Sequence, residues 1–199
     1  MRRDGASLVR DDQRAAAEAT LILAFAEDPV QRWLYPETER YLEGFPIFLA
    51  QTSAAAYDAG GVWHLGDSSA VAVWMPPDAH EDDEVLVSSL TQTVDSSKHA
   101  DLMAMLDRMS VLQPAAPHWH LPWFGVDPFR QGRGLGQKLM SACLREIDAR
   151  NQIAYLESTN PRNVPFYERL GFTVTGHIDI PGAPPMIAML REARKGRPR

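Results

Sequence analysis

The segment Gln131-Gly132-Arg133-Gly134-Leu135-Gly136 concentrates glycine between an expected strand and an expected helix. Glycine lets the backbone approach a ligand closely, and the N-terminus of a helix presents N–H groups to an anion. Two other phosphate-binding patterns do not fit. The fingerprint G-x-G-x-x-G would need glycine at Gln137, and the P-loop would need Gly-Lys-Ser/Thr at a fixed distance. The pattern Q-x-x-G-x-G therefore predicts a turn that holds a diphosphate.

Several side chains that can transfer or accept protons lie near this turn in the sequence. Tyr167 carries a phenol that can donate a proton or pack its ring in the core. Asn160 can hydrogen-bond a ligand or cap the helix that begins at Pro161. Glu157 lies near the end of an expected strand and His120 lies on the preceding one, so either could accept a proton from an amine.

Two segments, Gly125–Gly136 and Asn160–Phe172, occur in an order and at a spacing that resemble the GNAT acetyltransferase superfamily. The first segment contains the superfamily signature Gln/Arg-x-x-Gly-x-Gly/Ala. Within the superfamily, the chain looks most similar to the puromycin N-acetyltransferases. The likeness is clearest from about Val62 to the C-terminus, and it does not extend over residues 79–116.

The resemblance implies an α/β fold: a GNAT-like mixed, mostly antiparallel twisted sheet, with a splayed central strand pair, flanked by helices. A bulge opens that pair, and the pantetheine arm of acetyl-CoA, the expected acyl donor, hydrogen-bonds in the gap. By motif position, the resemblance assigns cofactor binding to Phe124, Val126, Gln131, Gly132, Arg133, Gly134, Leu135, Gly136, Gln137 and Asn160.

The resemblance also implies catalytic roles. The N–H of Val126 would donate to the thioester oxygen, and Tyr167 would protonate the departing thiolate. The general base is left open between Glu157 and His120, because members of the superfamily use different residues, sometimes through water. The spacing of the histidines does not match a metal site with any nearby acid, so no metal is expected.

The acceptor is less well defined by the sequence. Trp33, Tyr35, Trp63 and Trp74 could line an aromatic pocket for an apolar amine, or could belong to the core. The acidic run Glu81–Glu84 could attract a cation or simply begin a helix. The predicted function is an acetyl-CoA-dependent N-acetyltransferase that acts on a primary amine of a small molecule by direct attack on the thioester. Alternatives are a protein lysine or N-terminal acetyltransferase and a non-catalytic acyl-CoA-binding regulator.

The elements that must position these residues follow from hydrophobic periodicity and from Gly and Pro punctuation. Within the helix expected over 133–150, an apolar stripe contains Cys143, which predicts a buried, unreactive thiol. An aromatic turn, rather than a helix, is expected over 32–36. Strands are expected over 7–10, 62–65, 70–75, 118–126, 153–158, 172–180 and 185–190. Helices are expected over 13–26, 37–57 with a bend or break near Gly44 and Pro46, 81–112 in two pieces, 133–150 and 163–170.

The composition limits the class of protein. A chain of 199 residues with 45% hydrophobic and 23% charged residues fits one domain (1–199), with the acyl-CoA-binding part at about 62–192 and a basic tail at 193–199. The net charge of −6, with basic residues clustered only from Arg191 onward, argues against a nucleic-acid partner. No apolar run approaches the roughly 20 residues of a membrane span. With a single cysteine and no apolar leader, a cytoplasmic monomer or homodimer is expected, without a membrane partner.

Overall fold

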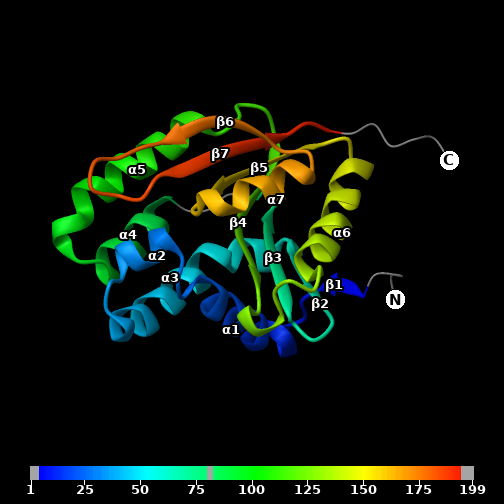
Figure 1. Cartoon of the computed structure of the whole chain (residues 1–199), viewed down its shortest axis with the longest axis horizontal. Coiled ribbons are helices and arrows are strands. Elements are labelled where there is room, and N and C mark those ends of the chain that lie inside the picture. Colours follow the sequence, from blue (N-terminus) through cyan, green and yellow to red (C-terminus); the bar gives the residue numbers. More distant parts are fainter. Residues whose placement is uncertain (1–4, 80–82, 194–199) are drawn as a thin grey trace.

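The computed structural model describes residues 5–79 and 83–193. Within these residues, seven strands form one sheet in the order β1-β2-β3-β4-β5-β7-β6 (Figure 1). The strands are β1 (Ala6–Leu8), β2 (Val62–Leu65), β3 (Ala70–Met75), β4 (His118–Val126), β5 (Ile153–Ser158), β6 (Thr173–Ile178) and β7 (Met186–Arg191). Neighbouring strands are antiparallel except for β4 and β5, which are parallel. The expected mixed sheet is confirmed.

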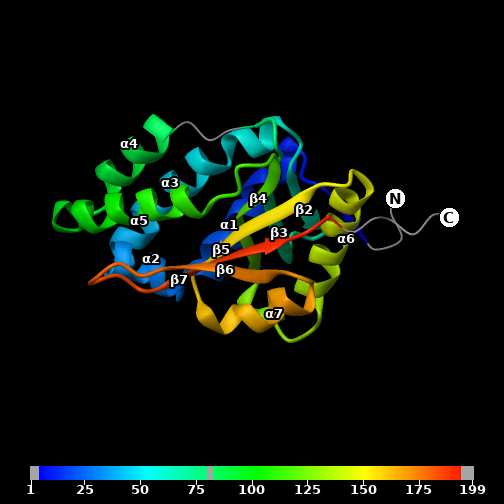
Figure 2. The same ribbon diagram turned by 90° about the horizontal axis from the view of Figure 1, so that it is seen from above.

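Helices cover both faces of this sheet (Figure 2). The helices are α1 (Arg14–Phe25), α2 (Pro29–Leu34), α3 (Thr38–Asp58), α4 (Asp83–Thr93), α5 (His99–Leu112), α6 (Leu135–Ala149) and α7 (Val164–Arg169). Residues of α1 to α5 pack into one hydrophobic core, centred on Phe45 and Trp123. Residues of α6 and α7 pack into a second core on the opposite face, which contains Cys143 and Phe172. None of the described helices is long and apolar enough to cross a membrane.

A bulge in β4 changes which side chains face each core. Val73 of β3 pairs with Trp123, but Met75, two residues later, pairs with His120, so β4 carries one extra residue between them. Pro122 lies in this interval, and proline is tolerated at a bulge because it has no N–H to give to the ladder. The bulge brings His120 and Trp123 to the face covered by α1 to α5.

The prediction of a turn over residues 32–36 is wrong, because Pro29–Leu34 forms the helix α2. Pro29 occupies the first helical position, which suits its fixed φ angle. The carboxylate of Asp28 accepts hydrogen bonds from the N–H groups of Val30 (3.0 Å) and Gln31 (3.2 Å), which caps the helix. The Asp-Pro pair therefore begins a helix here as well as ending α1.

Two other expectations are corrected. Helix α3 runs without interruption through Gly44 and Pro46, and the carbonyl left without a donor by Pro46 belongs to the exposed residue Leu42. Arg191 is not part of a tail, because it ends β7 and is buried. Of the acidic run, residues 81 and 82 lie outside the described residues, as does the basic tail from residue 194 onward.

Candidate functional site

The site begins where β4 and β5 separate. Across the described strands, pairing between them ends at His120 and Tyr155, and the strands then diverge (Figure 1). On its other side, β4 stays paired with β3 as far as Val126. The second half of β4, which includes Phe124, therefore has one edge whose backbone groups are not used by β5. An extended ligand can add to such an edge as an extra strand.

The predicted glycine turn lies at the end of this open edge. Gly132 and Gly134 have φ angles of +73° and +75°, and a Cβ at either would meet no described atom within 4 Å. Gly134 is the N-cap of α6, so the first N–H groups of that helix point toward an open surface. Gly136 is needed for another reason, since a Cβ there would lie 3.1 Å from the Phe124 ring and 3.3 Å from Val126. This geometry fits the diphosphate of an acyl-CoA.

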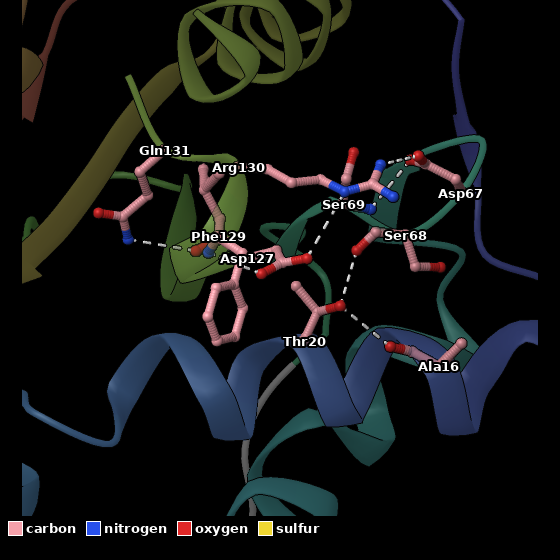
Figure 3. A network of polar contacts seen from close by, with 10 residues as sticks. Ala16, Thr20, Asp67, Ser68, Ser69, Asp127, Phe129, Arg130 and Gln131 are labelled. Atoms are coloured by element: carbon pink, nitrogen blue, oxygen red, sulfur yellow. Dashed lines mark hydrogen bonds and ion pairs between the residues drawn. The ribbon is translucent and has the colours of Figure 1, made fainter. Parts of the chain in front are cut away.

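Polar contacts hold the chain that leads into the turn (Figure 3). The N–H of Asp127 donates to the carbonyl of Ser69 at 3.0 Å. The guanidinium of Arg130 pairs with the carboxylate of Asp67. Hydrogen bonds from Ser69, followed by the contact with Arg130, lower the pKa of Asp67 from 3.8 to about 2. The β2–β3 hairpin therefore anchors the loop that follows β4.

Three predicted cofactor-binding side chains lie on the surface of the turn. The side chain of Gln131 donates to the carbonyl of Val126 at 3.3 Å and that of Gln137 to a serine one turn along α6 at 3.2 Å. The charged side chain of Arg133 is exposed beside them. Leu135 is half-buried and packs on the second core. Among these four, Arg133 is placed to add a cationic contact, and the others shape the turn.

Tyr167 lies in α7, packed against the rings of Phe166 and Phe172. Phe166 in turn stacks on Phe124 of β4, with ring centroids 5.6 Å apart. Burial, and then the negative charge of Asp28, raise the pKa of the Tyr167 phenol. A phenol that keeps its proton at neutral pH, beside the open edge of β4, can act as a proton donor.

Asp28 was missed by the sequence analysis. Its side chain is buried at 8% exposure and accepts a hydrogen bond from the hydroxyl of Thr159 at 2.6 Å. Burial raises the pKa of Asp28, and hydrogen bonds from Thr159 and the α2 backbone partly oppose this. The Asp-Pro cap was the available signal, but its proximity to Tyr167 joins segments too distant in sequence to predict.

The two candidate bases form one unit. His120 Nε2 and Glu157 Oε2 are 2.7 Å apart, with the side chains 15% and 3% exposed. Tyr155 packs against the His120 ring, and burial and the Glu157 charge raise the pKa of its phenol. A hydrogen bond between the Tyr155 and Glu157 side chains adds to this rise, and Tyr155 Oη and Glu157 Oε1 are both buried. A cluster of three polar side chains thus lies where β4 and β5 separate.

Asn160 behaves as a cap. Its side chain accepts the N–H of Arg162 at 3.1 Å, at the start of the 3-10 turn Pro161–Asn163. This is one of the two roles that the sequence left open. The same side chain can still contact a ligand at its exposed surface.

The aromatic residues do not form the shared pocket that the sequence analysis considered. Trp63 and Trp74 belong to the core under α6, on the opposite face from α2, where they line a smaller cavity of about 360 Å³ together with Trp119. Tyr35 is fully buried, with its hydroxyl 2.8 Å from the hydroxyl of Thr93. A cavity of about 770 Å³ lies elsewhere, between the end of β3, α4, α5 and the start of β4, and His120 is part of its lining.

Comparison with known proteins agrees with this geometry. A sequence model of the Acetyltransferase (GNAT) family matches residues 55–172. This match covers more than half of the chain, so the protein belongs to the GNAT acetyltransferase family. It is therefore a GNAT-type N-acetyltransferase, and the family implies an acyl-CoA donor.

Individual relatives show the same class. The chain is 29% identical over 177 residues to an uncharacterized N-acetyltransferase of Schizosaccharomyces pombe, covering 82% of this chain and 71% of that protein. A structure from Corynebacterium glutamicum, described as histone acetyltransferase HPA2 and related acetyltransferase, has a TM-score of 0.69 at 23% identity, covering 95% of this chain and 96% of that one. Arylalkylamine N-acetyltransferase 2 of Aedes aegypti has a TM-score of 0.68 at 14% identity, covering 95% and 98%. These likenesses support the superfamily and do not single out the puromycin N-acetyltransferases.

Proposed function

We propose that the protein transfers the acetyl group of acetyl-CoA to a primary amine of a small molecule. The observation that carries this proposal is the open edge of β4, which runs from His120 to the glycine turn at the start of α6. Groups that can transfer protons lie near that edge: the His120–Glu157 pair where the strands separate, and Tyr167, whose neighbour Phe166 stacks on Phe124.

Acetyl-CoA supplies an acyl thioester when bound, and the chain supplies position and charge. The carbonyl of Phe124 and the N–H of Val126 would hydrogen-bond the pantetheine arm. The N–H of Val126 would also donate to the thioester oxygen, where negative charge grows during attack. N–H groups from Gln131 to Gln137 would bind the diphosphate, with the helix dipole of α6 and Arg133 adding positive field.

Three proton movements complete the transfer. The acceptor ammonium loses a proton to the His120–Glu157 pair, directly or through one water, and its lone pair then attacks the thioester carbon. As the carbon–sulfur bond breaks, Tyr167 donates its proton to the departing thiolate. The acylated nitrogen then loses its extra proton, which restores the phenol and leaves a neutral amide and the CoA thiol. The phenol is protonated at neutral pH, and burial makes it a weaker acid, so the donation depends on the negative charge that develops on the sulfur. The buried carboxyl of Asp28 is a second candidate base, on the Tyr167 side of the gap.

A small molecule fits better than a protein substrate because the cavity beside His120 is bounded by four separate segments of the chain. Its volume of about 770 Å³ lies within the range of roughly 300–1,000 Å³ typical of small-molecule pockets. Puromycin remains one amine to test, given the resemblance of the segments from Val62 onward to that subfamily.

A thiol-release assay tests the proposal. The full chain is incubated with acetyl-CoA and a panel of small amines, puromycin and a lysine-containing peptide, and the N-acetylated product is identified by mass spectrometry. We expect release that depends on a small amine. Release only with the peptide would favour a protein acetyltransferase, and binding of acetyl-CoA without amine-dependent release would favour a non-catalytic regulator.

A further inference from the structure

The connection between β3 and β4 builds the cavity beside His120. This connection contains α4 and α5, which lie at one end of the molecule near α3 (Figure 2). The lining comes from the end of β3, from both helices, from residues 113–117 and from the first residues of β4. Of these segments, only β4 continues into the open edge described above. Among the lining residues on β4, His120 is the one nearest the point where the strands separate.

Most of the residues in the cavity wall are apolar, and Asp107, Ser110, Gln113 and His118 add polar groups to it. Its lining includes Met103, Met109, Leu86 and Leu106, together with prolines and alanines from the flanking segments. Methionine side chains are flexible and polarisable, so such a wall can adapt to alkyl or aromatic groups. Among the described lining residues the one carboxylate is Asp107, which is exposed on α5. If an acceptor carried a second ammonium, its ion pair with Asp107 would be exposed to water, and exposed ion pairs contribute little to affinity.

The inner end of the cavity is polar. His120 lines the cavity, and behind it lies the buried Glu157 carboxylate, which is 2.7 Å from His120 Nε2 and also interacts with the Tyr155 phenol. The imidazole is the group that an ammonium or a water in the cavity can reach. The site thus has a histidine at the end near the open strand edge, and a patch of methionine and leucine side chains on α4 and α5 in the rest of its wall.

Resting on the proposed function, we propose that this cavity binds the acceptor and selects a primary monoamine with an apolar alkyl or arylalkyl body. The amino group lies at the His120–Glu157 end, and the apolar body lies against the methionines and leucines of α4 and α5. A diamine or polyamine is disfavoured, because its second ammonium would lose water against a mostly apolar wall. A lysine side chain in a peptide is disfavoured because its polar backbone would have to enter the same wall.

A matched pair of amines tests the selection in the wild-type protein. Hexylamine and 1,6-diaminohexane have the same chain and differ at the far end by one ammonium. We expect kcat/KM for hexylamine to exceed that for the diamine by about 10- to 100-fold. Along the series butylamine, pentylamine and hexylamine, kcat/KM is expected to rise about two- to fourfold per methylene. Equal rates, or a preference for the diamine, would overturn the inference while leaving the proposed function intact, whereas a preference for a lysine peptide would count against both.

Two variants on α5 test whether the preference between amines arises in the cavity wall. Met103→Asp places a carboxylate in the cavity wall, and is expected to lower kcat/KM for hexylamine and raise it for 1,6-diaminohexane. Val111→Asp is the matched control, because Val111 is on the same helix, 71% exposed and outside the lining. It is expected to leave both rates near wild type. Circular dichroism and acetyl-CoA binding check that each variant is folded.

Two further outcomes would show that the acceptor assignment is wrong, and each has a different cause. If Met103→Asp alters the preference between acetyl-CoA and hexanoyl-CoA but not between the two amines, the cavity holds the acyl chain and the inference is wrong. If no amine releases thiol although acetyl-CoA binds, the proposed function fails, and the acceptor assignment fails with it.

Discussion

His120 and Glu157 are hydrogen-bonded at the point where β4 and β5 stop pairing, with Nε2 and Oε2 2.7 Å apart. This contact joins two residues that the sequence offered as alternatives. A carboxylate that accepts a ring N–H fixes the orientation and tautomer of a histidine. One of the two residues can therefore accept the proton from the ammonium while the other orients it.

The pH profile of turnover, measured for variants of both residues, identifies which one is the base. We expect turnover to rise with pH through one ionisation, because a protonated imidazole cannot accept a proton from the ammonium. Glu157→Gln keeps the shape of the side chain but removes the charge that stabilises the imidazolium formed when His120 accepts the proton, so it should lower turnover. His120→Phe should abolish the rise. An unchanged profile in both variants would transfer the role of base to Asp28 or to water, and Asp28→Asn then distinguishes these two.

Tyr167→Phe removes the proposed proton donor while keeping the ring that packs on Phe166 and Phe172. Turnover should fall by about 10²- to 10⁴-fold, which is the usual contribution of a general acid. The affinity for acetyl-CoA, measured by calorimetry, should change little. Turnover equal to wild type would mean that the thiolate takes its proton from water or from another group.

Gly134→Glu should abolish acetyl-CoA binding, because it adds a carboxylate where the diphosphate is expected. The φ angle of +75° means that any side chain also strains the backbone. Gly134→Asn is the appropriate control, since asparagine tolerates this conformation and adds no charge. Calorimetry should show much weaker binding for the glutamate variant than for the asparagine variant. Equal affinities in two folded variants would place the diphosphate elsewhere.

The thiol of Cys143 should be inert in the folded protein. It is buried at 1% exposure, and burial raises its pKa from 9.0 to about 12. Iodoacetamide at pH 8 should therefore label it slowly in buffer and rapidly in urea, as read by mass spectrometry. Since the folded state disfavours the thiolate, its contribution to stability is present below the ordinary thiol pKa and is lost as pH rises toward 12. Fast native labelling would contradict this assignment.

Arg191 and Asp148 should contribute strongly to stability. The guanidinium makes two hydrogen bonds to the Asp148 carboxylate, at 2.6 and 2.8 Å, and one to the carbonyl of Leu170 at 3.0 Å. Asp148→Ala leaves a buried cation without its partner, which typically costs about 3–5 kcal/mol. Urea unfolding should show a loss of this order. The exposed pair Arg10–Asp12 is a control, and Asp12→Ala should change the midpoint little.

Local patterns predicted much of the fold. The strands over 62–65, 70–75, 118–126 and 153–158 have the predicted bounds, because β-rich runs there are bracketed by glycine, proline or polar turns. Helix α2 was missed because residues 32–36 were expected to form a turn, whereas the signal for the helix precedes them, at Asp28-Pro29. The proline cannot continue a preceding helix, yet it can begin the next one.

The site was predictable in its motifs and not in its contacts. The glycine turn and Tyr167 follow from sequence order, since each is set by a short segment. The pairing of His120 with Glu157 depends on the register between two parallel strands, which a long connection separates. The acceptor-side cavity depends on how α4 and α5 pack, in a segment that resembles no motif.

Gly136 couples the helix of the cofactor site to the strand beneath it. A methyl group at this position would approach the Phe124 ring to 3.1 Å, so α6 already sits as close to β4 as the two side chains allow. The superfamily signature permits alanine here, but in this chain the Phe124 ring and Val126 would have to move by a few tenths of an ångström to accept it. In descendants and relatives of this protein, residues 124 and 136 should therefore change together. A large residue at one position is expected to occur with glycine at the other. The two residues together would then set the distance between α6 and β4.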